Sequence, residues 1–153
     1  MHDTYPGPTT WPPVASLVPQ QGSMCLLDHV IDANDRHIVV AVFPSSEDLF
    51  ADTRGIPVQV ALEWMAQASA AWSTLQPREG GTPRQGMLLG ARRFEARLDH
   101  LTFDQPLHVR VSVDTLADSG LATFDGVLYR PGENPEHDWL ARASLSVLQA
   151  AAG

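Results

Sequence analysis

Apolar residues run almost without interruption from residue 58 to residue 72, which predicts a helix buried on most of its sides. Pro57 stands just ahead of this run, where its missing N–H costs a helix nothing. The pattern continues to about Leu75 and stops before Pro77, a residue that ends helices. The sequence therefore predicts one long buried helix, from just after Pro57 to about Leu75.

The polar residues of this helix are few and regularly placed. Gln59, Glu63 and Gln67 are four residues apart, so they form one narrow stripe flanked by apolar residues such as Val60 and Trp64. A stripe of this kind faces either a lined cavity or open solvent at the edge of a core helix, and periodicity alone favours neither. A carboxylate in a lined cavity can do acid–base work, so Glu63 is the first candidate for chemistry.

The rest of the pattern is typical of strands. Apolar and polar residues alternate cleanly over residues 107–113 and again over 139–147. Polar turn residues at Asn34-Asp35 and at 118–120 separate further apolar segments. We expect strands at 26–33, 37–43, 87–94, 107–113, 121–130 and 139–147. The chain order is thus two strands, the helix, and a meander of about four long strands.

A helix buried on nearly every side needs a curved sheet around it, because one flat face would leave it exposed. The predicted fold class is therefore α+β, with a long central helix wrapped by a curved antiparallel sheet in a single domain over residues 14–150. Residues 1–13 contain four prolines and are expected to form an extended arm. The free edges of such a sheet favour pairing across a dimer.

Composition places the chain among ordinary globular proteins. Its 153 residues fit one domain, and 44% apolar with 18% charged residues is an average balance. The single cysteine, Cys25, excludes an internal disulfide and fits a reducing compartment. No apolar run is long enough to span a membrane and the start of the sequence lacks a signal pattern, so we expect a cytoplasmic protein.

The charged residues exclude several reaction types and binding partners. The formal charge is −8, and all ten basic residues are arginine. Without lysine, Schiff-base chemistry and a P-loop lysine are excluded, and the acidic balance argues against nucleic acid. No spacing resembles a metal site. The densest basic cluster is either a solvated strand end or a dock for an acidic partner, and comprises Arg84, Arg92, Arg93 and Arg97.

Three segments resemble one known family. Residues 62–68, Leu-Glu-Trp-Met-Ala-Gln-Ala, resemble the central-helix signature of the hotdog-fold 3-hydroxyacyl-acyl carrier protein dehydratases. Residues 18–28, Val-Pro-Gln-Gln-Gly-Ser-Met-Cys-Leu-Leu-Asp, resemble the opening motif of the same family, and residues 86–94 look closest to its aryl-polyene-type subgroup. The resemblance spans about residues 17–148 and implies a hotdog fold, an acyl thioester substrate, an acyl carrier protein partner and no cofactor.

The resemblance also implies site residues, and two of them depart from the family. The family's catalytic histidine lies fourteen residues before the helix carboxylate, where this chain has Leu49, and the histidine of the opening motif is Gln20. We expect Glu63 to act as the acid–base group, with Gln67 orienting it and Gln20 orienting a water or hydroxyl. Glutamine cannot serve as a general base at neutral pH, and losing a positioned base costs roughly 10²–10⁴ in rate.

The substrate site is expected to form around the start of the helix. The backbone N–H of Val58 stands where the family polarises the thioester carbonyl, and a helix N-terminus suits that task. The residues expected to line the substrate are Val58, Gln59, Leu49, Phe50 and Gly90.

The sequence is compatible with three different functions. The first is dehydration of a 3-hydroxyacyl thioester in fatty-acid or polyene-type synthesis. The second is a catalytically impaired subunit that binds acyl carrier protein or completes a heteromeric dehydratase, as homodimer or with a related hotdog chain. The third is hydrolysis of an acyl thioester, because hotdog thioesterases also use a helix carboxylate.

Overall fold

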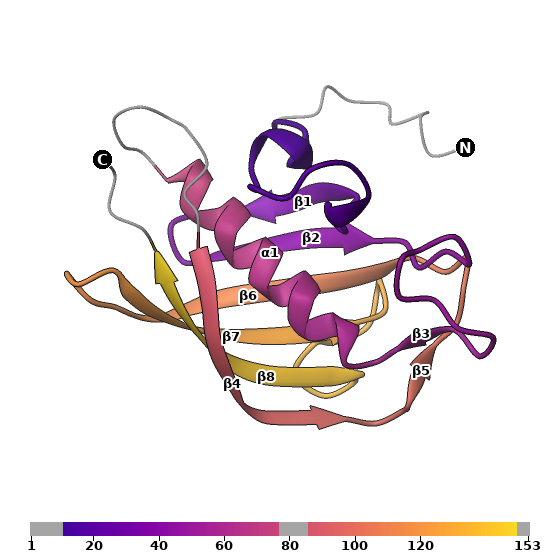
Figure 1. Ribbon diagram of the computed structural model, residues 1–153. Helices are drawn as coiled ribbons and strands as arrows, with labels where there is room; N and C mark the ends of the chain where they lie inside the picture. Colours follow the sequence, from indigo (N-terminus) through magenta and orange to yellow (C-terminus); the bar gives the residue numbers. More distant parts are fainter. Residues whose placement is uncertain (1–10, 77–85, 150–153) are drawn as a thin grey trace.

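The computed structural model describes residues 11–76 and 86–149. Its main element is a six-stranded antiparallel sheet in the order β1-β2-β6-β7-β8-β4 (Figure 1). These strands are β1 His29–Ala33, β2 His37–Val42, β4 Gly86–Ala96, β6 Leu107–Leu116, β7 Leu121–Tyr129 and β8 Ala141–Gln149. A separate two-stranded sheet pairs β3 Ile56–Pro57 with β5 His100–Leu101. Two short 3-10 helices precede β1, η2 Val14–Ser16 and η3 Gly22–Met24.

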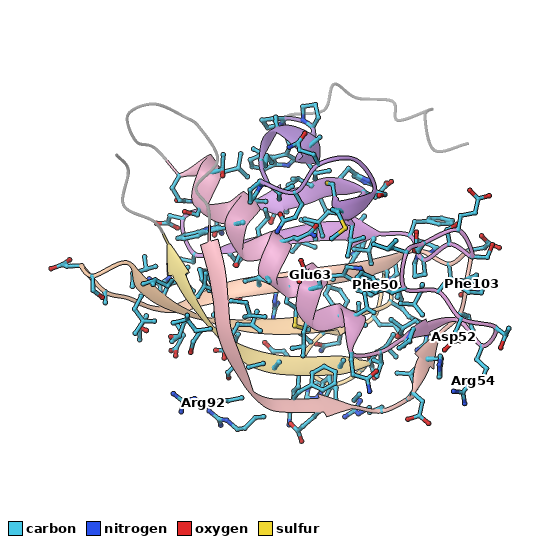
Figure 2. All side chains as sticks on the ribbon, in the orientation of Figure 1. Phe50, Asp52, Arg54, Glu63, Arg92 and Phe103 are labelled. Atoms are coloured by element: carbon cyan, nitrogen blue, oxygen red, sulfur yellow. The ribbon has the colours of Figure 1, made fainter. Side chains whose placement is uncertain are left out.

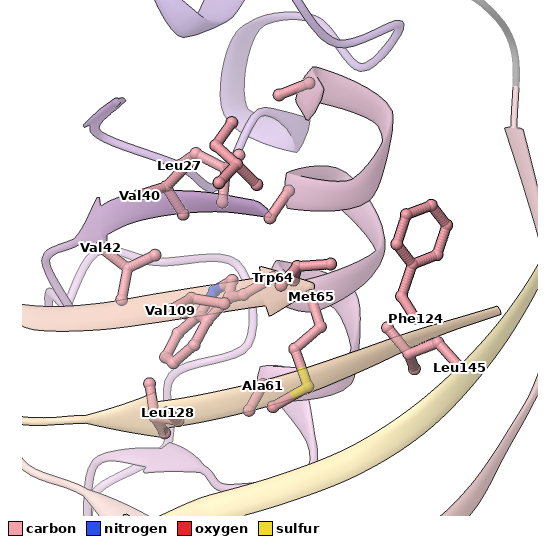
Figure 3. Close-up of a cluster of buried hydrophobic side chains, with 14 of the residues drawn as sticks. Leu27, Val40, Val42, Ala61, Trp64, Met65, Val109, Phe124, Leu128 and Leu145 are labelled. Atoms are coloured by element: carbon pink, nitrogen blue, oxygen red, sulfur yellow. The ribbon is translucent and has the colours of Figure 1, made fainter. Parts of the chain in front are cut away.

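One α-helix, α1 Val60–Leu75, lies across the concave face of the sheet (Figure 1). Ala61, Met65, Ala68 and Trp72 recur every three or four residues and are at most 4% exposed, so they form the stripe that faces the sheet. Trp72 packs edge-on against Phe124 of β7, with ring centroids 5.8 Å apart. Figure 3 shows the part of this core between α1 and the sheet. The prediction of one central helix wrapped by a curved antiparallel sheet is confirmed.

The close contact between helix and sheet depends on a glycine in β7. A Cβ built at Gly126 would come within 2.5 Å of Sδ and 3.3 Å of Cβ of Met65. Met65 therefore lies directly on the backbone of β7, at a position where no larger residue fits without movement. This contact sets the distance between α1 and the middle of the sheet.

The strand order corrects the predicted meander. β4 follows the helix in the chain, but it pairs with β8 at one edge of the sheet and not with β6. The chain between β4 and β6 contains the short strand β5, which pairs with β3 just ahead of the helix. Strands of two residues carry no periodic signal, so pattern analysis missed both. The six longer strands are found where they were predicted, with ends shifted by up to three residues.

Two element boundaries differ from the prediction for identifiable reasons. The helix begins at Val60 and not directly after Pro57, because the N–H of Val58 donates to the carbonyl of Asp99 at 2.9 Å and continues the β3–β5 pairing. β1 begins at His29 and not at Leu26, whose N–H is bound by a helix side chain. The predicted end of the helix at Leu75 is confirmed.

Side chains of the helix also hold the chain outside the sheet. Thr74 Oγ1 donates to the carbonyl of Leu17 at 2.8 Å, and Trp72 Nε1 donates to the carbonyl of Asn34 at 2.9 Å. Trp11 packs partly buried against the core, whereas residues 1–10 of the expected arm lie outside the described residues. No helix in the described part of the chain is long and apolar enough to cross a membrane.

β4 bends strongly along its length (Figure 1). Its pairing with β8 is interrupted by irregularities between Leu88 and Gly90 and between Arg92 and Glu95. Arg93 lies within the second irregularity and has a φ of 55°, in the left-handed region that a β-bulge can require. As a result, the first half of β4 stands beside α1, and the second half continues beneath β8.

Candidate active site

The side-chain amide of Gln67 is fully buried and is held by the segment before β1. Its Oε1 accepts the N–H of Leu26 at 2.9 Å, and its Nε2 donates to the carbonyl of Met24 at 2.8 Å. These two main-chain partners determine which end of the amide is oxygen and which is nitrogen. The other N–H of Nε2 is then directed at Oε2 of Glu63, 3.2 Å away. Residues 20–26 are called the strap below.

Glu63 lies one helical turn before Gln67 and is half-buried. It lines a cavity of about 80 Å³ between α1, the strap and the edge of the sheet. Figure 2 places Glu63 on the helix, on the concave side of the sheet. The lining residues are Pro19, Gln20, Glu63, Ala66, Ala70, Leu88 and Val147. The cavity thus has two polar side chains, Glu63 and Gln20, and is otherwise apolar.

The cavity lies at the open edge of the sheet. Leu88 of β4 and Val147 of β8 are paired across the two strands and form its wall on that side. Val147 is 4% exposed, whereas Leu88 is 37% exposed. The wall formed by Leu88 therefore borders solvent in the single chain.

Gln20 is the second polar residue of the cavity. Its Oε1 is buried and accepts no hydrogen bond from the described residues. A buried acceptor left without a donor costs about 1–3 kcal/mol. A ligand that donates a hydrogen bond to Gln20 would recover this cost, which suits the expected contact with a hydroxyl or water.

The structure brings together Glu63, Gln67 and Gln20, the three residues predicted to carry the chemistry, but it places the predicted substrate residues elsewhere. Val58 is 3% exposed and its N–H is bound to Asp99, so in this chain that N–H is not free to polarise a thioester carbonyl. Gln59 is exposed at the start of the helix. The polar stripe therefore passes from solvent at Gln59 to the interior at Gln67.

Leu49, Phe50 and Gly90 do not line the Glu63 cavity either. Leu49 is 58% exposed and lines a separate cavity of about 250 Å³, between the strap and the loop after β2, which is also lined by Cys25 and Trp64. Phe50 is 42% exposed beside it, and Gly90 is exposed on the open edge of β4. Their role in substrate binding remains a prediction.

No histidine lines the cavity of Glu63. His100 is paired with Asp52 at 2.9 Å beside β3, where the N–H of Arg54 and the His100 contact lower the pKa of Asp52. His108 lies on the convex face of the sheet, edge-on to Tyr129, and burial together with repulsion from His29 lowers its pKa. Among the residues that line this cavity, Glu63 is the only one with an acid–base side chain.

The predicted arginine cluster divides in the structure. Arg97 donates from one nitrogen to the carbonyls of His137 and Trp139, at 2.8 and 3.2 Å, and its guanidinium stacks on the Trp139 ring at 3.8 Å. Arg92 and Arg93 are exposed on β4, and Figure 2 shows Arg92 outside the sheet, away from the helix. Arg84 lies outside the described residues. Arg97 thus holds the loop before β8 in place, whereas Arg92 and Arg93 are exposed and Arg93 also lines a cavity on the convex face of the sheet.

A larger cavity, of about 620 Å³, lies on the convex face of the sheet. Two pairs of its polar groups bind one another: Arg142 Nε donates to Oε1 of Glu95 at 2.7 Å, and Ser144 donates to Oδ1 of Asp125 at 3.1 Å. None of the three predicted catalytic residues lines it. The smaller cavity at Glu63 is therefore the candidate active site.

Sequence reasoning missed the apolar part of this site. Ala66 and Ala70 lie three and seven residues after Glu63, so helical spacing alone places them on its face of the helix. Leu88 and Val147 come from strands whose pairing does not follow chain order, and no local pattern indicates that they meet. The main-chain groups of Met24 and Leu26 carry no side-chain signal at all.

The fold and the site together define the class of protein: a hotdog-fold protein with a helix carboxylate at the edge of its sheet. The family model described as ApeP-like, ApeP dehydratase, matches residues 12–152. The chain therefore belongs to the ApeP-like dehydratase family, as the aryl-polyene-type resemblance predicted.

Solved structures agree with this assignment. The dehydratase heterocomplex ApeI:P from Xenorhabdus doucetiae contains a chain that is 26% identical, with 93% of each chain covered and a TM-score of 0.77. A hypothetical thioesterase with coenzyme A from Streptococcus pneumoniae TIGR4 is 11% identical over 80% of this chain and 84% of that one, with a TM-score of 0.59. The PaaI protein of E. coli is 8% identical over 78% and 81%, with a TM-score of 0.57. The last two show the hotdog fold alone, and the comparison with curated proteins gives no match.

Proposed function

We propose that this chain is the Glu63-bearing subunit of a heteromeric 3-hydroxyacyl-thioester dehydratase, and that its substrate is carried by an acyl carrier protein in a fatty-acid or polyene-type synthesis. The observation that carries the proposal is the Glu63 cavity: an oriented carboxyl group, no base beside it, and an open edge where a second subunit would complete it. A similar chain occurs in a dehydratase heterocomplex, which supports a partner of the same fold.

In the proposed reaction, a base removes a proton from C2 of the substrate while Glu63 gives a proton to the hydroxyl at C3. The C3–O bond breaks, water leaves, and the electron pair of the C2–H bond becomes the C2=C3 double bond. Gln67 keeps Oε2 of Glu63 in place through its N–H, so that the other carboxyl oxygen is left for the substrate. Gln20 accepts a hydrogen bond from the reacting hydroxyl or the departing water. The partner subunit supplies the base.

The experiment is an assay for the enoyl product from a 3-hydroxyacyl carrier-protein substrate, with the chain alone and with a candidate partner subunit. We expect turnover only with the partner, and loss of turnover in Glu63→Gln. Glu133→Gln is the matched control, because Glu133 is an exposed carboxylate that lines neither the Glu63 cavity nor the cavity at Leu49. Full turnover by the complex that contains Glu63→Gln would contradict the proposal.

The acyl carrier protein is the proposed partner of Arg92 and Arg93, because both are exposed and neither is ion-paired in the described part of the chain. Carrier proteins are acidic, and rim charges mainly change the rate of association and its dependence on salt. Arg92→Ala should therefore raise KM for the carrier-bound substrate and leave kcat nearly unchanged. An equal rise in KM for a substrate without the carrier protein would argue against a carrier contact.

Thioester hydrolysis is the second candidate, because the hotdog neighbours include a hypothetical thioesterase solved with coenzyme A. It would use Glu63 to activate a water in the same cavity. Free acid released from acyl thioesters by the chain alone, with loss of that activity in Glu63→Gln, would decide for hydrolysis. Enoyl product without free acid would decide for dehydration.

A further inference from the structure

The cavity of about 620 Å³ on the convex face is separated from Glu63 by the sheet itself. Gly126 of β7 lies against Met65 of the helix, so the side chains of Asp125 and Val127 point to the opposite face, where they line this cavity. The loop before β8 contributes Pro135, Glu136 and Trp139 to the wall. None of these wall residues takes part in the proposed dehydration chemistry.

Two arginines flank Val127 in one row across the sheet. Val127 pairs with Arg110 of β6 on one side and with Arg142 of β8 on the other, where the register of both strand pairs is regular. Neighbouring strands are about 4.8 Å apart, so the two arginines start roughly 10 Å from each other, with the short side chain of Val127 between them. Both line the cavity. Their guanidinium groups can therefore reach one anion placed over Val127.

The two arginines differ in what binds them. Arg142 is held in place, because its Nε donates to Oε1 of Glu95 at 2.7 Å and its guanidinium lies 4.4 Å from the centre of the Trp139 ring. Its terminal N–H groups have no partner in the described residues. Arg110 is half-buried and makes no hydrogen bond or ion pair in the described part of the chain. Arginine is rarely withdrawn from water without a partner, and its planar fork suits a carboxylate, so this row favours an anionic group.

A carboxylate lies in the next row of the same face. Asp125 precedes Val127 by two residues, a distance of about 6.7 Å along a strand. Ser144 donates to Oδ1 of Asp125 at 3.1 Å, and Oδ2 has no partner in the described residues. Asp125 forms no ion pair with the two arginines, although both are its diagonal neighbours in the sheet. Opposite charges therefore line one cavity without neutralising each other.

The balance of charge argues against a plain anion as the ligand. Apart from the Arg142–Glu95 pair, three carboxylates and two arginines line the cavity: Asp114, Asp125, Glu136, Arg93 and Arg110. A polyanion would meet more negative than positive charge there. A ligand that carries both signs can satisfy the row of arginines and the row of Asp125 together.

We propose that this cavity binds a small zwitterion whose charges are about 7 Å apart, with the anion between Arg110 and Arg142 and the cation at Asp125. The two ends of an extended dipeptide have this spacing, because each residue spans at most about 3.3–3.6 Å. The volume of about 620 Å³ leaves room for side chains as well. The inference goes beyond the proposed dehydratase function and does not depend on it, since the two sites lie on opposite faces of the sheet.

The test is calorimetric titration of the full chain with diglycine. Acetate and methylamine, which carry one charge each, should bind about tenfold more weakly than diglycine or worse, because each leaves one charged row unpaired. Glycine should also bind more weakly, because its two charges are too close together to reach both rows. Inorganic phosphate that binds as tightly as diglycine would indicate a plain anion site and overturn the inference. So would an absence of diglycine binding at millimolar concentrations.

Variants locate the bound zwitterion. Arg110→Gln and Asp125→Asn should each weaken diglycine binding about tenfold, whereas Glu63→Gln should leave it unchanged. Arg36→Gln is the matched control, since Arg36 is exposed in the β1–β2 turn outside the cavity. If circular dichroism shows that Arg110→Gln does not fold, Arg110→Lys replaces it, because lysine keeps the charge but loses the planar fork. Unchanged binding in the variants of Arg110 and Asp125 would overturn the inference.

Discussion

Gln67 donates a hydrogen bond from Nε2 to Oε2 of Glu63, 3.2 Å away and one helical turn earlier. The donor is not free to rotate, because the same amide binds the main chain of the strap at both ends. The orientation of the candidate acid therefore depends on a segment that belongs to neither the helix nor the sheet.

Gln67→Leu is expected to lower the free energy of unfolding by about 2–4 kcal/mol. The change leaves the carbonyl of Met24 and the N–H of Leu26 without their partners at a partly buried site, and the loss of a partner costs a buried group about 1–3 kcal/mol. Urea denaturation measures the effect. Gln59→Leu is the control, since Gln59 is exposed, and should change stability by less than about 0.5 kcal/mol.

Gly126→Ala is expected to destabilise the fold by about 1–3 kcal/mol, because the added methyl group would overlap Met65 where α1 touches β7. Thermal unfolding followed by circular dichroism measures it. Gly90→Ala is the matched control, since nothing lies within 4 Å of a Cβ built there. Equal stability of the two variants would show that α1 does not depend on this contact.

Arg97→Ala should destabilise the protein by about 1–2 kcal/mol, whereas Arg92→Ala should not. Arg97 loses two hydrogen bonds to carbonyls and its stacking on Trp139, a cation–π contact of about 0.5–1 kcal/mol at such a site. Arg92 makes no comparable contact in the described residues. Similar stabilities for the two alanine variants, measured by urea denaturation, would contradict the division of the cluster.

Stability should fall as the pH drops below about 6.5. Burial, with repulsion from His29, lowers the pKa of His108 from 6.5, so the unfolded chain takes up its proton at a higher pH than the folded chain does. Stability from this group is complete above pH 6.5 and is lost between that pH and the lower pKa of the folded state. His108→Gln should flatten the dependence in this range. Urea denaturation of the unaltered protein and the variant at several pH values measures the effect.

The sequence predicted the parts of the molecule that follow from periodicity. The helix, the longer strands and the placing of Glu63 and Gln67 on one line all arise from spacing within a single element. Several strand orders are compatible with the same elements along the chain, and no local pattern determines that β4 lies at the edge beside β8. For the same reason Leu88 and Val147 were not predicted as walls of the site.

The availability of the Val58 N–H was predicted from its place at the helix start, and that expectation was wrong. The group that binds it, the Asp99 carbonyl, lies 41 residues further along the chain and reaches it through the β3–β5 pairing. Main-chain partners of this kind have no residue type to identify them. Gln67 shows the converse: its complete burial was predicted neither by its polarity nor by its place on the stripe, because its partners are the main-chain groups of the strap.

The orientation of Glu63 depends on the strap, so it can be lost in a molecule whose domain is still folded. It holds Gln67 through two hydrogen bonds, so a brief local opening of residues 20–26 can release that amide while the six-stranded sheet stays intact. The amide proton of Leu26 should then exchange with solvent faster than that of Val40, which is 0% exposed in β2, a strand that is paired on both sides. During each opening the carboxyl group of Glu63 loses its fixed donor. The free energy of this local opening, and not the stability of the whole domain, then sets the fraction of molecules in which Gln67 orients the carboxyl group of Glu63.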